Sequence, residues 1–276
     1  MMLLDTDANV VYLSPWLKAE YPDVYAGLIR ILHENVVDYS LIPDTADLWC
    51  RDYMPVQIGI DDFVCYRYWP DYLLRRKSDV RYITDTRQVC RALGLTCRYS
   101  DIIIDGGNVV KTGNHVIMTE KVFAENPMFS RDELSDRLTE LFGCPIVFLP
   151  WDRLEIYGHA DGLVKPVSPA TVLLTNYGDF DKDLFYEMHR RLSACFHVEC
   201  LHYDVKKKDA RSWAYINFLS VGKLIVLPSL GIDEDEQALG QIKAYYPDCV
   251  VEQLDVRDLV AAGGALNCVT WCRKVN

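Results

Sequence analysis

The chain has 276 residues, of which 50% are hydrophobic and 12% aromatic, with 29 Lys and Arg against 40 Asp and Glu. This apolar content is sufficient for a folded core and excludes a fully disordered chain. The net charge of −11 opposes binding to the phosphates of nucleic acids and favours a cationic or neutral ligand.

The N-terminal residues and the cysteines bear on the compartment. Residues 1–5 lack the basic start and long apolar run of a secretory signal, and no apolar stretch approaches the roughly 20 residues of a membrane span. The ten cysteines include no C-x-x-C pair, so neither a zinc knuckle nor a redox dithiol is indicated. We expect a cytoplasmic protein that does not engage membranes and whose cysteines are mostly buried and reduced.

Periodicity and turn signals predict one order of elements, a hairpin followed by a helix and a strand, four times in succession. The predicted hairpins are residues 55–68, 108–119, 162–175 and 214–228. The predicted helices are residues 84–93, 131–142, 181–195 and 233–245. The strands that complete these units are residues 97–104, 145–149, 198–203 and 250–254. Gly94 marks the end of the first helix, and Ser130 with Glu133 has the spacing of a capping box before the second.

The two ends of the chain supply the parts of a fifth unit. These parts are a strand at 10–13, a helix at 22–33, a strand at 36–42 and a C-terminal strand at 266–270. One polar residue or thiol recurs near the start of each unit at intervals of 53, 56, 56 and 51 residues: Asp52, Asp105, Asp161, Asn217 and Cys268. We therefore expect an α/β fold in which residues 1–276 form a single domain of five ββαβ-like modules around a pseudo-symmetry axis. The fifth module would be shared between the N- and C-termini.

Four segments contain the candidate functional residues: 49–52, 105–108, 158–161 and 263–268. Each segment alone also has a purely structural explanation. Cys268 is explained as a buried thiol, and Asp52 as a turn residue or as the ion-pair partner of its neighbour Arg51. His159 and Asp161 are two residues apart, so on a strand they would share one face, where the carboxylate favours the protonated imidazole.

Together the four segments predict a more specific chemistry. A thiol, an imidazole and two or three carboxylates in phase suit a planar cation, because guanidinium presents several N–H donors that two carboxylates can accept. Trp49 precedes Asp52 by three residues and could stack on the face of such a cation. The combination predicts a site in which a thiolate faces the central carbon of a guanidinium group.

In this order and spacing, the four segments resemble the agmatine deiminase and bacterial-type peptidylarginine deiminase family. That family consists of guanidino-group-modifying enzymes with the five-bladed α/β-propeller, or pentein, fold. The resemblance extends over residues 41–271 and includes Glu125-Asn126-Pro127 and Tyr215-Ile216-Asn217-Phe218. The chain departs from the family pattern at Asn267, where His is frequent, and in lacking a Gln-x-Pro ending.

The resemblance implies hydrolytic deimination of agmatine or a related small guanidino compound, with release of ammonia and a ureido product. It makes Cys268 the nucleophile, which forms a covalent thiouronium intermediate, and His159 the general acid and base. Asp52 and Asp161 would bind the guanidinium group. The residues expected to contact substrate are Trp49, Asp52, Asp105, Asn108, Glu155, Asp161, Asn217 and Gly264. Glu155 would hold the substrate's cationic end.

The resemblance also bears on partners. It implies no metal and no organic cofactor, and the expected partner is a small cationic guanidino substrate rather than nucleic acid or membrane. A homodimer is one assembly compatible with the sequence. Alternative activities are a peptidylarginine or free-arginine deiminase, and an amidinotransferase with an amine in place of water. A further alternative is a non-catalytic guanidinium-binding protein, although such a protein would not need the thiol of Cys268.

Overall fold

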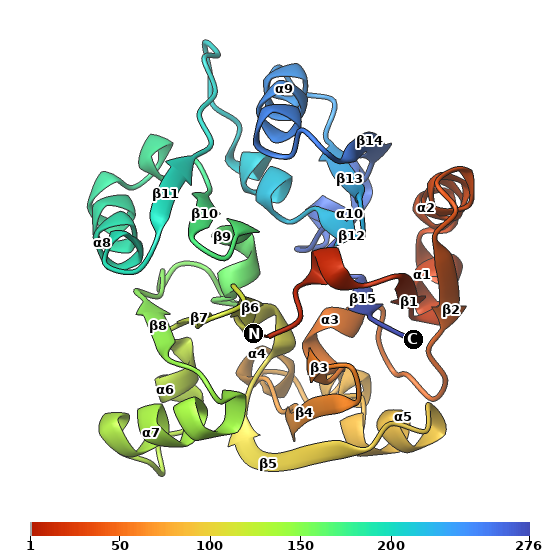
Figure 1. The fold of residues 1–276 in the computed structure, drawn as a ribbon, viewed down its shortest axis with the longest axis vertical. Coiled ribbons are helices and arrows are strands. Elements are labelled where there is room, and N and C mark those ends of the chain that lie inside the picture. Colours follow the sequence, from red (N-terminus) through yellow and green to blue (C-terminus); the bar gives the residue numbers. More distant parts are fainter. Residues whose placement is uncertain (1) are drawn as a thin grey trace.

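The computed structural model describes residues 2–276. Within this range the strands form five three-stranded sheets, and the sheets are arranged around a common centre (Figure 1). Each sheet joins an antiparallel pair to a third strand that runs parallel to the middle one. A parallel neighbour requires a crossover connection, which a helix supplies in every module. The predicted α/β fold of five ββαβ-like modules is therefore confirmed.

Four of the sheets are each built from one continuous stretch of chain. The first module contains β3 (Val56–Gly59), β4 (Asp62–Arg67) and β5 (Cys97–Ile103). The second contains β6 (Val110–Lys111), β7 (Val116–Thr119) and β8 (Ile146–Leu149). The third contains β9 (Val164–Ser168), β10 (Thr171–Leu174) and β11 (His197–Cys200). The fourth contains β12 (Leu219–Val221), β13 (Leu224–Ser229) and β14 (Val250–Asp255).

The fifth sheet combines strands from both ends of the chain, as the sequence predicts. Its middle strand β1 (Val10–Leu13) pairs with β2 (Asp38–Leu41) on one side and with β15 (Thr270–Arg273) on the other. The prediction of a strand at 266–270 was wrong in its bounds. Residues 266–269 form turns instead, because the hydroxyl of Thr270 donates to the carbonyl of Leu266 at 2.7 Å and the amide of Val269 donates to that of Ala265. Cys268 therefore lies in a turn rather than on a strand.

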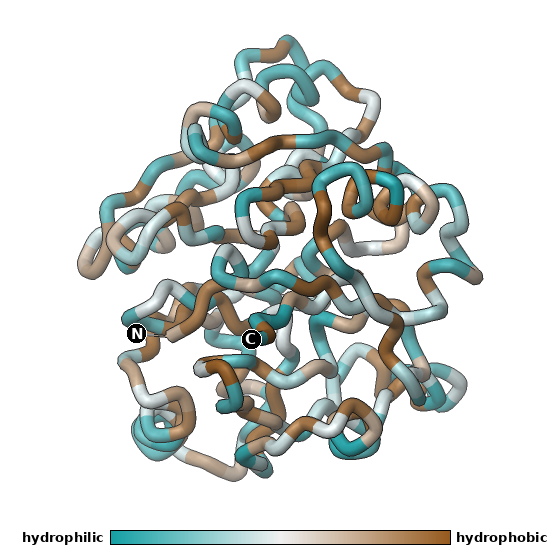
Figure 2. Tube along the Cα trace, turned by 45° about the vertical axis from the view of Figure 1, so that its right-hand side comes forward, coloured by the Kyte–Doolittle hydropathy of each residue, from teal (hydrophilic) through white to brown (hydrophobic). Residues whose placement is uncertain are grey.

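Helices of two to four turns lie on the outside of the ring (Figure 1). They are α2 (Pro22–Glu34), α5 (Thr86–Ala92), α7 (Arg131–Phe142), α8 (Lys182–Ser193) and α9 (Asp235–Tyr245). Along them the chain alternates between hydrophilic and hydrophobic residues (Figure 2), so that one side of each helix packs on its sheet. In α7 that side is formed by Leu134, Leu138 and Phe142. The hydroxyl of Ser130 accepts from the amide of Glu133 at 3.2 Å and caps the same helix, as predicted.

Shorter helical segments connect the strands and helices. The one- and two-turn helices are α1 (Pro15–Glu20), α3 (Cys50–Tyr53), α4 (Asp71–Leu74), α6 (Lys121–Glu125) and α10 (Arg257–Ala261). The 3₁₀ turns are Asp5–Asp7, Asp79–Tyr82, Gly106–Asn108, Ala160–Gly162, Tyr177–Asp179 and Ala210–Ile216. The 3₁₀ turn at 210–216 occupies the predicted start of the fourth hairpin. Several of these segments lie at the beginnings of modules, where they carry candidate functional side chains.

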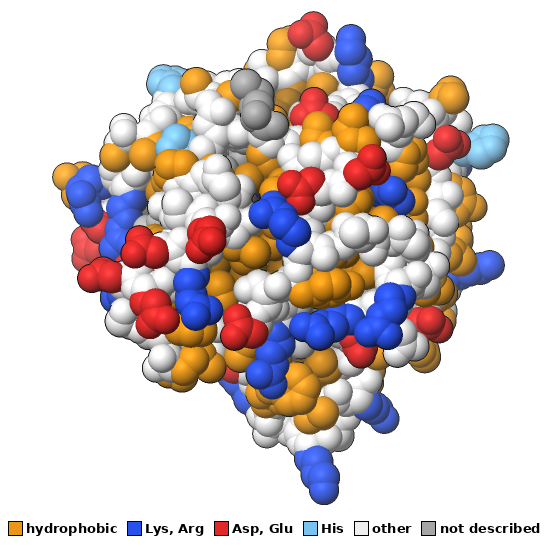
Figure 3. All heavy atoms as spheres, turned by 60° about the horizontal axis from the view of Figure 1, so that its bottom comes forward, with side chains coloured by type: hydrophobic (Ala, Val, Ile, Leu, Met, Phe, Trp, Pro, Cys, Tyr) orange, Lys and Arg blue, Asp and Glu red, His pale blue; other side chains and the backbone are white. Residues whose placement is uncertain are grey.

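The surface and the helices give two facts relevant to partners. On the face shown in Figure 3, acidic and basic side chains are interspersed rather than segregated by sign. No helix within residues 2–276 has both the length and the apolar character needed to cross a bilayer.

Candidate active site

A cavity of about 750 Å³ lies where the beginnings of the modules meet. Four of the five polar residues predicted to recur in phase line it: Asp52, Asp161, Asn217 and Cys268. They come from four different segments, which are α3, the turn 160–162, the residue after the turn 210–216, and the turn before β15. Pseudo-symmetry therefore brings equivalent positions of the modules together, as the spacing predicts.

The thiol of Cys268 is held by hydrogen bonds to an amide and a carboxylate. Its Sγ lies 3.2 Å from Oδ1 of Asn217 and 3.8 Å from Oδ2 of Asp161. The same Asn217 oxygen accepts from the Cys268 amide at 3.3 Å. Burial, together with the charges of Asp161 and Asp52, raises the pKa of Cys268 well above its ordinary value. Cys268 is thus a neutral thiol at neutral pH, and a cation bound beside these carboxylates would favour the thiolate.

His159 lies between two carboxylates. Its Nε2 is 3.1 Å from Oδ2 of Asp105 and its Nδ1 is 3.6 Å from Oδ1 of Asp52, and its side chain is only 9% exposed. Burial by itself would lower the pKa of His159, but the charges of Asp52 and Asp105 outweigh it and raise the pKa to about 9. His159 is therefore an imidazolium at neutral pH. His159 and Asp161 do not lie on a strand, because residues 160–162 form a 3₁₀ turn that His159 directly precedes.

Asp105 orients His159 from below the cavity and does not line it. The same oxygen, Oδ2, lies 3.3 Å from Nζ of the buried Lys121, and that ammonium also lies 3.1 Å from carboxyl oxygens of Glu125 and Asp71. Burial would raise the pKa of Asp105, but His159 and Lys121 together lower it. Asp105 is therefore ionised and contacts His159 and Lys121 rather than a bound ligand. Sequence reasoning missed Lys121 because nothing in its local pattern indicates burial.

Asp52 is the carboxylate on the opposite side of His159. Its Oδ1 accepts from the amide of Gly107 at 3.0 Å, and a Cβ at that glycine would lie 2.7 Å from the same oxygen and 2.6 Å from Nδ1 of His159. Only glycine fits this approach. Burial raises the pKa of Asp52 to about 7, although His159 opposes the shift. Arg51 pairs with Asp5 at 3.2 Å, so the alternative in which Arg51 pairs with Asp52 was wrong.

Asp161 is fixed by a chain of hydrogen bonds that runs to a buried lysine. Its Oδ2 accepts from Nδ2 of Asn267 at 2.7 Å, and Oδ1 of Asn267 accepts from Nζ of Lys165 at 2.8 Å. Lys165 also donates to the carbonyl of Phe218 at 2.9 Å. Asn267, which departs from the family pattern, is thus the link that orients Asp161. Sequence reasoning did not identify Lys165.

Trp49 and Gly264 form one wall of the cavity. A Cβ added at Gly264 would collide with the six-membered ring of Trp49. The missing side chain therefore allows the indole to lie directly against the backbone of the segment that leads to Cys268. This contact places the aromatic ring predicted to stack on a planar cation in the same cavity as the thiol.

Two other predicted residues occupy different surroundings. Glu155 is exposed at the cavity, where its carboxylate accepts from the amides of Tyr157, at 2.8 Å, and Gly158. Asn108 is not among the lining residues. Its Oδ1 accepts from the amide of Thr119 at 2.7 Å, so it joins the turn 106–108 to the end of β7.

The charge of the cavity is strongly one-sided. Among the described residues that line it, seven are acidic and none is Lys or Arg. The acidic residues are Glu20, Asp47, Asp52, Asp79, Asp152, Glu155 and Asp161. Several aromatic rings, among them Trp49, Tyr157 and Trp213, supply apolar wall between them. Such a cavity suits a ligand with cationic groups joined by an apolar stem.

Known proteins resemble this chain in sequence. The model of the Porphyromonas-type peptidyl-arginine deiminase family matches residues 28–272. A Mycoplasma capricolum protein, provisionally named an agmatine deiminase, is 26% identical over 67% of this chain and 61% of its own length. A Mycoplasma mycoides protein of the same provisional name is 25% identical over 87% of this chain and 78% of its own length. The chain thus spans about 60% to 80% of these relatives.

A solved structure shows the same fold. The agmatine deiminase of Enterococcus faecalis superposes with a TM-score of 0.76, at 16% identity, over 99% of this chain and 95% of its own. The similarity extends around the whole ring, so all five modules have counterparts in a known structure.

Proposed function

The chain belongs to the Porphyromonas-type peptidyl-arginine deiminase family, and from that premise we propose that it hydrolyses the guanidino group of a small cationic substrate, with agmatine as the best fit. One observation carries the proposal: Cys268, His159 and two carboxylates share a cavity whose described lining includes no Lys or Arg. A thiol, an imidazolium and an acidic pocket are the groups that deimination requires.

Binding begins with the guanidinium between Asp52 and Asp161. Each carboxylate accepts N–H donors from the planar cation, and Trp49 contacts its face. The positive charge then offsets the two carboxylates that raise the pKa of Cys268. The thiol releases its proton to solvent water, and the thiolate lies beside the electron-poor guanidinium carbon.

In the first half of the reaction a carbon–sulfur bond forms and a carbon–nitrogen bond breaks. The thiolate of Cys268 attacks the guanidinium carbon and gives a tetrahedral intermediate. The imidazolium of His159 donates its proton to the departing nitrogen, which leaves as ammonia. Cys268 then carries an S-alkylthiouronium group, and His159 is neutral.

In the second half the covalent intermediate is hydrolysed. Neutral His159 accepts a proton from a water molecule as its oxygen attacks the thiouronium carbon. Collapse of the new tetrahedral intermediate breaks the carbon–sulfur bond, returns Cys268 as thiolate and yields the ureido product. The new hydroxyl group loses its proton as it becomes the carbonyl of the ureido product. The released ammonia accepts a proton and becomes ammonium.

The lining charges support agmatine over free arginine. Agmatine carries an amine at the end of its apolar stem. Acidic residues such as Asp47, Asp152 and Glu155 line the cavity in addition to the pair proposed to bind the guanidinium group. Free arginine carries an α-carboxylate at that end. The described cavity residues include no Lys or Arg to receive it, and several carboxylates would repel it.

The test measures ammonia and ureido product from agmatine, free arginine and an arginine-containing peptide. We expect kcat/KM for agmatine to exceed that for arginine by at least about tenfold, the effect of one unfavourable charge contact of roughly 1.4 kcal/mol. Cys268→Ala should abolish turnover. Cys272→Ala is the matched control, because Cys272 is also a buried free thiol but lies on β15 outside the cavity.

Three outcomes would contradict the proposal. Turnover that persists in Cys268→Ala would show that Cys268 is not the nucleophile. Saturable agmatine binding without turnover by folded wild-type protein would identify a guanidinium receptor instead. Faster turnover of the peptide than of agmatine would support the peptidylarginine alternative.

A further inference from the structure

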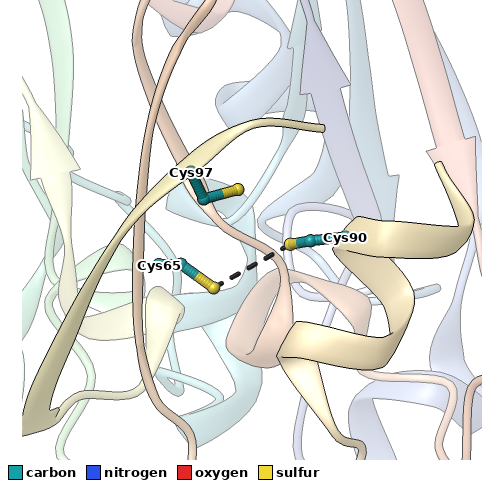
Figure 4. Close-up of side chains that lie close together, drawn as sticks. All are labelled: Cys65, Cys90 and Cys97. Carbon is teal, nitrogen blue, oxygen red and sulfur yellow. Dashed lines mark hydrogen bonds between the residues drawn. The ribbon is translucent and has the colours of Figure 1, made fainter. Parts of the chain in front are cut away.

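Three cysteines of the first module bring their sulfurs together away from the active site. Cys65 lies on β4, Cys90 on α5 and Cys97 on β5 (Figure 4). The three Sγ atoms all lie within 4.8 Å of one another, and those of Cys65 and Cys90 are 3.9 Å apart. None of the three lines the active-site cavity, and the proposed reaction uses none of them.

The topology of the module explains why three distant cysteines meet. β4 and β5 are parallel neighbours, with Cys65 aligned to Tyr99 and Phe63 aligned to Cys97. Cys97 and Tyr99 are two residues apart on one strand and so share a face, and aligned residues of neighbouring strands share it too. Helix α5 is the crossover between these strands and packs on the sheet. Cys90 on that helix therefore points at the face that carries Cys65 and Cys97.

The spacing of the sulfurs matches three ligands of one metal ion. A metal–thiolate bond of about 2.3 Å places three trigonal sulfurs about 4 Å from one another. The 3.9 Å separation of Cys65 and Cys90 has this value without any movement. A disulfide requires a sulfur–sulfur distance of about 2.05 Å, so the same two sulfurs would have to approach by nearly 2 Å.

We propose that Cys65, Cys90 and Cys97 form a three-thiolate binding site for a soft, thiophilic cation, namely Cu(I). Thiolates are soft donors that select Cu(I) and Zn²⁺ among biological ions. Closed structural Zn²⁺ sites take four protein ligands, whereas the group found within residues 2–276 consists of these three side chains alone. Each sulfur–copper bond replaces a sulfur–hydrogen bond and releases one proton, with no change in oxidation state.

The burial of the three thiols defines the path of entry. Cys65 and Cys90 are completely buried, while Cys97 is half-buried. The ion therefore reaches the cluster past Cys97, on the side where the guanidinium of Arg87 lies 4.9 Å from the ring centre of Tyr99. That positive charge lies near the site in which thiolates accumulate negative charge.

The test is a titration of the reduced, full-length protein with Cu(I) under anaerobic conditions, in competition with bicinchoninate. The protein carries Cys268→Ser so that the active-site thiol does not compete. We expect one tightly bound Cu(I) per chain and an X-ray absorption spectrum with three sulfur neighbours. Cys97→Ser should weaken binding at least about 100-fold, because even the loss of an outer-shell partner costs 10- to 100-fold. Zn²⁺ should bind more weakly than Cu(I).

Cys200→Ser is the matched control, because Cys200 is a half-buried strand cysteine that belongs to no thiol cluster found in residues 2–276. It should bind Cu(I) as the parent does. Wild-type protein gives a second measurement that needs no cluster variant: one equivalent of Cu(I) should protect Cys97 from alkylation and leave Cys200 reactive. The proposal would be overturned if the parent and Cys97→Ser bound Cu(I) with equal affinity, or if the X-ray absorption spectrum showed only two sulfur neighbours. It would also be overturned if Zn²⁺ bound more tightly than Cu(I), or if Cu(I) left Cys97 open to alkylation.

Discussion

Nε2 of His159 lies 3.1 Å from Oδ2 of Asp105, and neither side chain is more than 9% exposed. The same carboxylate oxygen lies 3.3 Å from the ammonium of Lys121. Lys121 keeps Asp105 ionised, and Asp105 in turn stabilises the charged form of His159. The proton that the proposed reaction gives to ammonia is therefore held in place before the substrate arrives.

Replacing Asp105 by Asn should shift the pH dependence of turnover. With its pKa of about 9, His159 stays protonated through neutral pH, so wild-type kcat should fall only above about pH 9. In Asp105→Asn the imidazolium loses one of its two carboxylates, its pKa falls, and the alkaline limb moves to lower pH. We expect kcat at pH 8 to fall by about 100-fold, in the range of general acid–base contributions. The measurement is a kcat–pH profile from pH 6 to 10.

Glu125→Gln is the control for that experiment. Glu125 also contacts Lys121, at 3.1 Å, but the carboxylates beside the imidazolium are those of Asp52 and Asp105, and Glu125→Gln leaves both in place. The kcat of Glu125→Gln should fall over the same alkaline pH range as that of the wild type. An unshifted limb in Asp105→Asn would mean that Asp105 does not set the charge of His159.

Replacing Asn217 by Ala should slow chemistry and destabilise the fold. The substitution removes the acceptor for both the thiol and the amide of Cys268 and the donor to the carbonyl of Asp161. Buried groups left without partners cost about 1–3 kcal/mol, and a misplaced nucleophile costs up to about 100-fold in rate. Thermal unfolding and kcat for agmatine check the two effects. Wild-type kcat would show that Cys268 does not depend on this contact.

Replacing Asn267 by Ala should weaken substrate binding more than it slows chemistry. Asp161 loses its 2.7 Å hydrogen bond, and Lys165 loses its side-chain acceptor. A hydrogen bond to a charged group is worth about 1.5–3 kcal/mol, so KM should rise at least about tenfold while kcat falls less. Asn267→Gln, which keeps the amide, should recover part of the loss. A change in kcat with constant KM would contradict a role in positioning Asp161.

Replacing Gly264 by Ala should displace Trp49 from the cavity wall. The added Cβ collides with the indole ring, and overpacking of this kind costs about 1–3 kcal/mol of stability. We expect kcat/KM to fall by 10- to 100-fold. Gly240→Ala is the matched control, because a Cβ there meets no atom within 4 Å and the residue lies within α9. Gly240→Ala should retain activity, and its free energy of unfolding should rise by up to about 1 kcal/mol. Equal activity of the two variants would show that Trp49 does not contribute to binding.

The periodic parts of the fold could be predicted from the sequence. Hairpin turns such as Gly113-Asn114, the cap at Ser130 and the apolar side of helix 131–142 are local signals, and the repeat of about 55 residues adds their order. The repeat also identified which polar residues would meet, because equivalent positions of a ring converge. The partners of those residues lie in other modules, so only the folded ring determines them.

Asp105 and Lys121 illustrate the limit. The sequence placed Asp105 among substrate-contacting residues, since it recurs in phase with Asp52 and Asp161. In the structure Asp105 does not line the cavity, and its Oδ2 contacts both Lys121 from α6 and His159. A lysine at the start of a short helix carries no local sign that it will be buried. Lys165 on β9 likewise carries no local sign of burial, because its acceptors lie 53 and 102 residues away in the sequence.

The pairing of β1 with β15 links the order of folding to the appearance of activity. In chain order, β1 is the first strand of the ring and β15 the last, so this pair closes the longest loop in the fold and is expected to form slowly. Cys268 lies in the turn that leads directly into β15. A partly closed ring would have folded modules but a displaced nucleophile. The proposed activity would thus appear only after the last strand had docked.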